Sequence, residues 1–229
     1  MSETAAGAET ADDLAPALDA SLSLSPSTLF SSDELAMARR LVCDLGKPPS
    51  DHINATSLSK KGGSGALVWR CRPEGCSFDS YVFEAVLPCA LETFVQMSLS
   101  VESRAIWDDH TKKMEILKSQ GPMAELAAFH GAEGDHLTLY WQVAAPFPLS
   151  SREYYFRRRL GVLPAYGPSG SAVLFLVDVP LGSSDPVCCE HKVPRRTVRV
   201  SDYYQHSVLL RGKEAGTTIL RNVYREDPV

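Results

Sequence analysis

Hydrophobic residues that alternate with polar ones, in one segment after another, restrict the fold most. In residues 137–143, Leu137, Leu139, Trp141 and Val143 alternate with Thr, Tyr and Gln. A period of two is typical of a half-buried antiparallel strand. Similar strand patterns, separated by turn residues, occur at 66–71, 77–87, 111–118, 122–130, 152–163, 171–179, 195–210 and 216–226. One sheet of this many strands curls, and the space inside the curl must be filled by a helix, by side chains or by a ligand.

Short helical patterns accompany the strands. Ser31 and Glu34 form a predicted capping box, and apolar residues follow at helical spacing, so we expect a helix over 31–45 that ends at the next glycine. A stripe of apolar residues over 89–99 predicts a second, short helix, and 103–108 is expected to be a turn or a helical end. Together the patterns predict an α+β fold with one curved antiparallel sheet.

The N-terminal residues differ from the rest in composition. They are rich in Ala, Ser, Asp and Thr without a sustained period, which predicts a disordered acidic tail over 1–30 and a domain over 31–229. Residues 1–38 hold seven acids and no Lys or Arg, so the remainder carries 23 basic against 21 acidic residues. Such a weakly basic body argues against nucleic acid as a partner, because duplex binding usually calls for a strongly basic face.

The sequence lacks several targeting and metal signals. It has no run of 18 apolar residues and no secretory leader, and its acidic N-terminus is unlike a mitochondrial presequence, so we expect a cytoplasmic protein. Its six cysteines are then expected to be free thiols. The spacing of Cys71, Cys76, Cys188 and Cys189 is not that of a standard zinc site, so no metal is expected.

Motifs for covalent chemistry are also lacking. The chain has no Gly-rich phosphate loop, no nucleophile elbow and no HExxH motif. The best local acid–base pair is Asp109 and His110, whose side chains are expected to point apart because the residues are adjacent. We therefore expect no enzyme activity and no cofactor.

Three stretches, in order, resemble the START family of lipid-transfer domains. They are SRAIWD (103–108), YWQVAAPFPLSSREYYFRRR (140–159) and VRVSDYYQHSVLL (198–210), followed by the terminal YREDP. The likeness extends over about 66–229, with helix 31–45 as a further candidate, and is greatest to the phosphatidylcholine-transfer branch. It implies a helix-grip fold, in which a nine-stranded antiparallel sheet surrounds an apolar tunnel for one lipid and a C-terminal lid helix closes it.

The resemblance also implies a set of head-group ligands. Arg104 matches the arginine that meets the lipid phosphate, while Trp141, Tyr154 and Tyr203 match aromatics that enclose choline. A guanidinium suits phosphate because it offers a planar fork of donors. A quaternary ammonium has no N–H and is attracted to aromatic ring faces. Strict alternation along 195–210 turns Tyr203 outward, so an inward position would require a bulge.

Ordinary structural roles compete with these assignments. Arg104 could simply pair with Asp108, and Trp141 could be a core residue of its strand. Trp107 is expected to pack between helix and sheet.

Charged residues elsewhere on the strands are expected to meet water. Asp178 interrupts an apolar run; if buried it would need a partner such as Arg158 or Arg104, but we expect it to be exposed near a strand end. Arg157 and Arg159 share the face opposite Tyr154 and are expected to form a solvated stripe, or secondarily a membrane-docking patch.

Two features depart from the family pattern. Segment 119–135 is longer than expected and could alter ligand access. The chain reaches Val229 just after Asp227 and Pro228, where the family continues into the lid helix. Without that helix we expect a tunnel with an open apolar wall, unless helix 31–45, a neighbouring chain or a membrane covers it.

The expected function is binding of phosphatidylcholine or a related phospholipid, and its transfer between membranes through transient surface contact. A carrier is needed because each CH₂ of an acyl chain costs about 0.8 kcal/mol to expose to water. Three alternatives remain: a sterol or ceramide in the same tunnel, a helix-grip enzyme acting on a small molecule, and a scaffold that binds no lipid.

Overall fold

The structure, a computed structural model, describes most of the chain from Phe30 onward. The described residues are 30–50, 56–58, 65–72, 76–120, 136–146, 148–163, 166, 171–191 and 197–227. The tail predicted over 1–30 lies outside them except for its last residue. The strand predicted over 122–130 and nearly all of the long segment 119–135 also lie outside the described residues.

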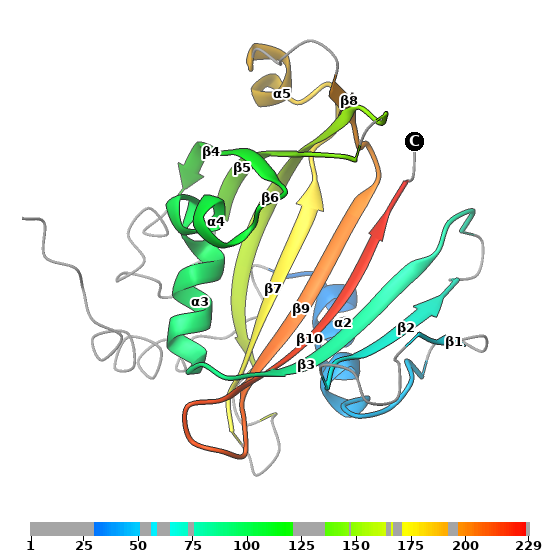
Figure 1. Cartoon of the computed structure of the whole chain (residues 1–229), viewed down its shortest axis with the longest axis vertical. Coiled ribbons are helices and arrows are strands. Elements are labelled where there is room, and N and C mark those ends of the chain that lie inside the picture. Colours follow the sequence, from blue (N-terminus) through cyan, green and yellow to red (C-terminus); the bar gives the residue numbers. More distant parts are fainter. Residues whose placement is uncertain are drawn as a thin grey trace, which may run out of the picture.

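One curved sheet dominates the fold (Figure 1). Its strands, in spatial order, are β1 (Thr56–Ser57), β2 (Leu67–Cys71), β3 (Ser80–Leu87), β10 (Thr218–Glu226), β9 (Tyr203–Arg211), β7 (Val173–Pro180), β6 (Ser151–Leu163), β5 (His136–Val143) and β4 (Thr111–Gln120). Neighbours in this order are antiparallel. The predicted fold class is therefore confirmed.

The sheet includes a parallel pairing that was not expected. β8 (Thr197–Arg199) pairs in parallel with the first residues of β6. The described sheet thus has ten strands instead of the nine implied by the family resemblance.

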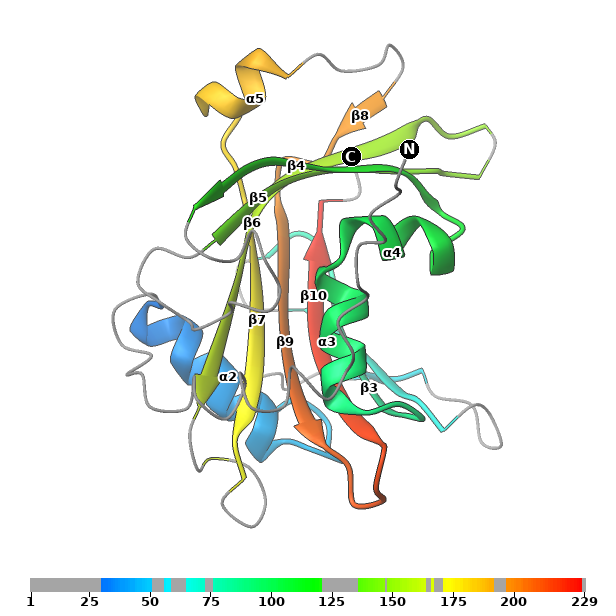
Figure 2. The same ribbon diagram turned by 90° about the vertical axis from the view of Figure 1, so that its left-hand side faces the viewer.

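Helices cover the two faces of the sheet unequally. α2 (Ser32–Cys43) lies against the convex face, whereas α3 (Leu91–Leu99) and α4 (Val101–Trp107) lie across the concave face (Figure 2). The helix predicted over 89–99 is thereby confirmed as α3. Segment 103–108, expected to be a turn or a helical end, forms most of α4 and its C-cap, Asp108. A further short helix, α5 (Pro186–Glu190), follows β7 and was not predicted.

The start of α2 has the capping box that the sequence predicts. The Glu34 backbone N–H donates to Ser31 Oγ at 3.2 Å, and the Ser31 backbone N–H donates to the Glu34 carboxylate at 2.8 Å. The helix ends at Cys43, and the chain then turns at Gly46, whose φ of 74° favours glycine. These local contacts fix the ends of α2 almost where its sequence pattern begins and ends.

The convex core is the layer between α2 and the sheet. It includes Phe30, Ala38, Leu41, Trp69, Val82, Phe175, Val177 and Val208. Arg159 also lies on this side, where its guanidinium pairs with Glu34 of α2. The expectation that Arg157 and Arg159 form one solvated stripe is therefore wrong for Arg159, because the helix covers it. Arg157 is half exposed and pairs with Asp185 at 3.1 Å.

The concave core contains the side chains that alternate with those of the convex layer. It joins α3 to the inner face of the sheet through Leu91, Val95, Leu139, Tyr154, Phe156, Leu160, Leu174, Leu176, Tyr203 and Leu209. Two cores on opposite faces explain why the central strands carry hydrophobic residues on both sides. The concave side is the one on which the predicted site residues gather.

Candidate functional site

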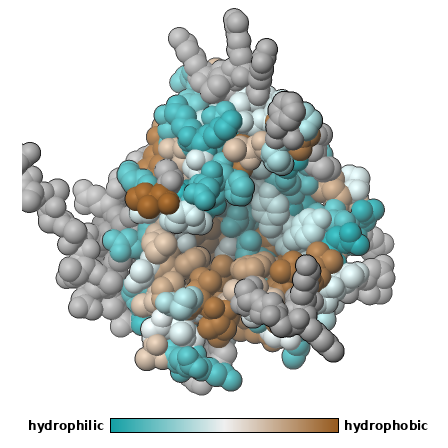
Figure 3. All heavy atoms as spheres, viewed as in Figure 1, coloured by the Kyte–Doolittle hydropathy of each residue, from teal (hydrophilic) through white to brown (hydrophobic). Residues whose placement is uncertain are grey.

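A cavity of about 170 Å³ opens on the concave face, between α3, α4 and strands β6, β7, β9 and β10. Its lining combines apolar with polar side chains: Phe94, Ser98, Arg104, Trp107, Arg158, Leu176, Gln205, Ser207, Leu209, Leu220 and Asn222. Figure 3 shows this side of the molecule, which is hollowed at its centre, with hydrophobic residues gathered below the hollow. Such a mixture suits a ligand with one polar and one apolar part.

Arg104 reaches the cavity from α4. Its Nε donates to Asp108 at 2.8 Å, which is the i,i+4 pair considered from the sequence. Its guanidinium also lies between two indoles, 4.3 Å from the ring centroid of Trp107 and 4.8 Å from that of Trp141. Burial lowers the pKa of Arg104, while the carboxylate of Asp108 opposes that shift. The cation is thus held by one charge and two aromatic faces.

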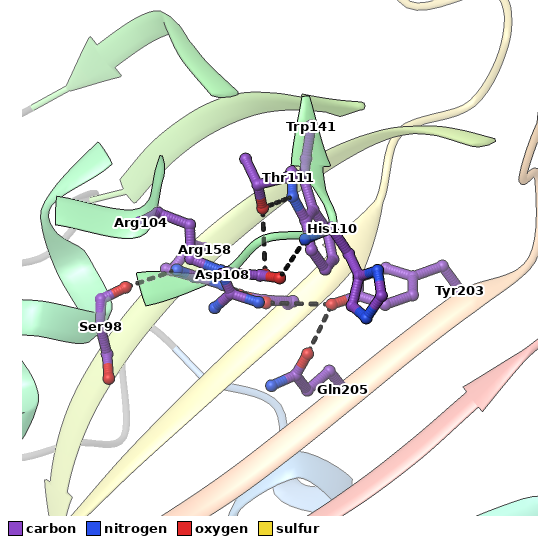
Figure 4. A network of polar contacts seen from close by, with 10 residues as sticks. Ser98, Arg104, Asp108, His110, Thr111, Trp141, Arg158, Tyr203 and Gln205 are labelled. Atoms are coloured by element: carbon purple, nitrogen blue, oxygen red, sulfur yellow. Dashed lines mark hydrogen bonds and ion pairs between the residues drawn. The ribbon is translucent and has the colours of Figure 1, made fainter. Parts of the chain in front are cut away.

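Asp108 orients this arginine and closes α4. Its carboxylate accepts from Thr111 Oγ1 at 3.0 Å and from the His110 backbone N–H at 3.1 Å. Burial favours the protonated acid, but the hydrogen bonds from Thr111 and Arg104 outweigh it and lower the pKa of Asp108. Thr111 Oγ1 also accepts from Trp141 Nε1 at 2.8 Å. The arginine, the acid and the indole therefore form one connected group (Figure 4).

The three aromatics predicted from the sequence lie together. Trp141 and Tyr154 are direct cross-strand partners, and their ring centroids are 5.2 Å apart. Tyr154 and Tyr203 are 5.3 Å apart in an edge-to-face arrangement, and Tyr203 also contacts Phe156 and Tyr224. The rings pack against one another, and the guanidinium of Arg104 lies over the ring of Trp141. The structure thus brings the residues together as a packed aromatic cluster.

Tyr203 faces inward for a reason other than a bulge within a strand. The strand predicted over 195–210 is divided into β8 and β9. Val200 and Tyr203 are three residues apart, yet both belong to the concave core. Residues 201 and 202 lie outside regular strand and reset the alternation. The sequence pattern could not show this break, because pairing with two different neighbours causes it.

Glu226 anchors the outer edge of the aromatic cluster. Its carboxylate accepts from the Tyr154 hydroxyl at 2.7 Å, from the Tyr224 hydroxyl and from Arg152. Burial first, and Glu226 second, raise the pKa of Tyr154 to about 12, so the phenol keeps its proton at neutral pH. Sequence reasoning missed Glu226, although it lies in the terminal YREDP stretch that was noted.

A buried ion pair lies beside the cavity, and it corrects the expectation that Asp178 is exposed. Asp178 is 0% exposed and binds Arg158 through two hydrogen bonds of 2.8 and 2.7 Å. Arg158 also donates to the backbone carbonyl of Ser98 in α3 at 3.0 Å. An acid inside an apolar run and an arginine two positions after Phe156 were the available signals. Their cross-strand register, which only the sheet reveals, makes them partners.

Tyr203 and Gln205 extend this network along β9. The Tyr203 hydroxyl donates to Gln205 Oε1 at 2.6 Å and lies 3.3 Å from the Asp178 carboxylate. Burial and the nearby Asp178 raise the pKa of Tyr203 well above its ordinary value. Figure 4 shows Arg158, Tyr203 and Gln205 in one group next to Arg104. The polar wall of the cavity is therefore a connected set of hydrogen bonds, of which those between Arg158 and Asp178 are charge-assisted.

Trp107 differs from its expected role as a plug between helix and sheet. The residue is 44% exposed, and its ring lies against the Arg104 guanidinium and forms part of the cavity wall. The neighbouring Ile106 is 82% exposed. The end of α4 thus presents apolar surface beside the cavity.

The acids along this part of the concave face are engaged with arginines. Asp108 pairs with Arg104, Asp178 with Arg158, and Glu226 with Arg152. Each of these carboxylates thus has an arginine as its ion-pair partner. Among the described residues no group of three or more His, Cys, Asp or Glu could hold a metal.

The described helices include none that is long and apolar enough to cross a membrane.

Comparisons with known proteins identify the fold. Neither a family model nor a curated protein sequence matches the chain. Solved structures do: human STARD10 has a TM-score of 0.60 and 12% identity over 90% of this chain and 71% of its own. The STAR-related lipid transfer protein of Xanthomonas axonopodis has a TM-score of 0.54 and 16% identity, over 76% of this chain and 82% of its own. Human StAR-related lipid transfer protein 5 has a TM-score of 0.54 and 15% identity, over 86% of this chain and 84% of its own. The chain therefore has the START-type helix-grip fold.

Proposed function

We propose that this chain binds one phospholipid, with phosphatidylcholine the first candidate, on the concave face of its sheet and transfers it between membranes. The proposal includes no covalent chemistry. The observation that carries it is the arrangement around the cavity: its lining combines Arg104, which lies against the aromatic cluster, with the apolar residues Phe94, Leu209 and Leu220. The names of the similar structures, which describe lipid-transfer proteins, support a lipid as the ligand.

Arg104 is proposed to meet the phosphate. The bond to Asp108 uses Nε, so both Nη groups can donate to phosphate oxygens. Asp108 would keep the guanidinium oriented, and the low-dielectric surroundings would strengthen its attraction for an anion. A neutral polar residue at position 104 would lose that attraction.

Choline is proposed to take the aromatic face that Arg104 now occupies. The guanidinium lies 4.8 Å from the Trp141 ring, so this face already attracts a cation. When phosphate draws the Arg104 guanidinium off the indole, the face of Trp141 would become accessible to the quaternary ammonium of the same lipid. Tyr154 and Tyr203 are buried and packed against each other, so they would supply neighbouring faces only after the concave side has opened. One ligand would thereby exchange one cation for another on the same aromatic surface.

Lipid uptake requires the concave side to open further. The cavity of about 170 Å³ is smaller than the roughly 300–1,000 Å³ typical of pockets for small molecules. α3 and α4 form its wall opposite the sheet, and α3 is tied to β6 by the bond between Arg158 and the Ser98 carbonyl. We propose that these two helices move apart from β9 and β10 to admit acyl chains.

The test measures uptake of fluorescent phosphatidylcholine from vesicles by purified protein. Arg104→Gln should weaken binding about 10- to 100-fold, because a charge-assisted bond contributes about 1.5–3 kcal/mol. Trp141→Ala should weaken it about 3- to 30-fold, the range expected for a cation–π contact of about 0.5–2 kcal/mol.

Arg157→Gln is the matched control, because Arg157 is half exposed on the other face of β6. Its uptake should equal that of the unmodified protein. Circular dichroism would establish that each variant is folded. Unchanged uptake in both folded site variants would contradict the head-group assignment. No uptake by the unmodified protein would contradict the proposed function.

A further inference from the structure

The inner faces of β9 and β10 change in character step by step along the cavity. Residues that face each other across the two strands form successive pairs: Tyr203 with Glu226, Gln205 with Tyr224, Ser207 with Asn222, and Leu209 with Leu220. The first pair belongs to the aromatic cluster, and the last is wholly apolar. Ser207 and Asn222 therefore lie between the polar end and the apolar end, about 13 Å along β9 from Tyr203 at roughly 3.3 Å per residue.

Polar side chains are unexpected at this depth. The neighbours of the pair in the same row across the sheet are Leu176 of β7 and Phe83 of β3. Ser207 is 5% exposed, and both it and Asn222 line the cavity. A polar group in such surroundings lowers stability unless it is hydrogen-bonded. The polar atoms of Ser207 and Asn222 thus require hydrogen-bond partners, either in the protein or in a ligand.

The hydrogen bond between the two residues leaves a donor for the cavity. The Ser207 hydroxyl donates to Asn222 Oδ1 at 3.0 Å, which occupies the carbonyl end of the amide. The Asn222 Nδ2 group carries two N–H donors, and among the described residues none accepts from it. A cavity that presents a donor at mid-depth suits a ligand with an acceptor there.

We propose that Ser207 and Asn222 form an ester-recognition subsite, in which Asn222 Nδ2 donates to an ester carbonyl of a diacyl lipid. This inference rests on the proposed function, because it assumes that the lipid occupies the same cavity. An ester carbonyl lies between the head group and the acyl chains, as the pair lies between the aromatic cluster and Leu209 with Leu220. Ser207 is the positioning residue, since it fixes which end of the amide faces the ligand.

The test compares two lipids that differ only at the proposed contact. Dioleoyl phosphatidylcholine has two ester carbonyls, and its dialkyl ether analogue has none but keeps the phosphate, the choline and the chain length. The unmodified protein should bind the diester about 2- to 10-fold more tightly than the diether, as expected for one net hydrogen bond. In Asn222→Leu, which has similar volume but no donor, that ratio should fall to about 1.

The diether is the internal control, because it does not use the amide. Binding of the diether by Asn222→Leu would show that the variant folds and takes up lipid, and the ratio of the two affinities removes any general effect of the substitution on the cavity. Equal affinities of the unmodified protein for both lipids, or a ratio that survives in Asn222→Leu, would overturn the ester subsite while leaving the proposed function intact. Binding of neither lipid by the unmodified protein would overturn both.

Discussion

Asp178 and Arg158 show how much one residue pair can depend on its surroundings. Both side chains are almost fully buried, at 0% and 7% exposure, and each is the main partner of the other. Removing both charges from such a site often changes stability little, whereas removing one leaves the other buried and uncompensated. The pair therefore gives a sharp test at the residue scale.

Asp178→Asn should lower the free energy of unfolding by about 3–5 kcal/mol, because it leaves the charge of Arg158 without a counter-ion. Urea unfolding followed by circular dichroism would measure the loss. The double variant Asp178→Leu with Arg158→Met should be clearly more stable than the single variant. Asp185→Asn is the control: its partner Arg157 is half exposed, so the loss should stay below about 1 kcal/mol. A double variant as unstable as the single one would contradict this account.

At the scale of elements, α2 is defined by its own sequence more than any other segment. The capping box fixes its start, and its apolar stripe packs on the convex face. α3 differs, because it has no side-chain cap and is held to the sheet by the bond between Arg158 and the Ser98 carbonyl, whereas Ser100 caps the start of the short α4. This difference fits the proposal that α3 and α4 move while α2 stays in place.

Ser31→Ala should lower the free energy of unfolding by about 1 kcal/mol, since it removes the acceptor for the Glu34 backbone N–H. Denaturant unfolding would measure the loss, and Ser32→Ala, one residue further into the helix, should stay within about 0.5 kcal/mol of the unmodified protein. Phosphatidylcholine uptake should not change, because α2 lies on the face away from the cavity. Equal stability of the two variants would contradict a role for the cap.

The stability of the whole molecule should depend on pH through His206, a histidine that becomes buried on folding. His206 is 0% exposed on the convex side, its Nδ1 lies 2.9 Å from the Tyr204 hydroxyl, and its Nε2 is buried without a partner among the described residues. Burial, and to a lesser degree Arg159, lower the pKa of His206 to about 4. The unfolded chain has a histidine pKa of about 6.5, so between these values only the unfolded state binds the proton.

Stability should therefore fall as the pH drops from about 6.5 toward 4, by up to roughly 3 kcal/mol from this group. Above pH 6.5 both states are neutral at His206, and its contribution to the pH dependence vanishes. Urea unfolding at a series of pH values would show the trend. His206→Gln should have a shallower dependence in this window, whereas His110→Gln, at an exposed position, should follow the unmodified protein. Parallel curves for all three proteins would argue against the buried histidine.

The features of this protein that can be predicted from sequence are those determined by residues close together in the chain. Alternation identified β5, β6, β7 and β10, and the capping box located α2. Alternation failed to predict the face of Tyr203, because the break between β8 and β9 follows from pairing with two different partners. It failed at Asp178 as well, because strand alternation gives the face of a side chain but not the residue beside it.

The sequence by itself determined the fold class, the positions of most strands and the residue types available for a head group. Only the tertiary structure decided that Arg104 lies on the ring of Trp141, that Arg158 neutralises Asp178, and that Ser207 faces Asn222 in a row of apolar side chains. The physical reason is the separation in sequence over which each interaction acts. Periodicity and caps act within a few residues, whereas the cavity is assembled from strands and helices that are distant in the chain and meet only through the register of the sheet.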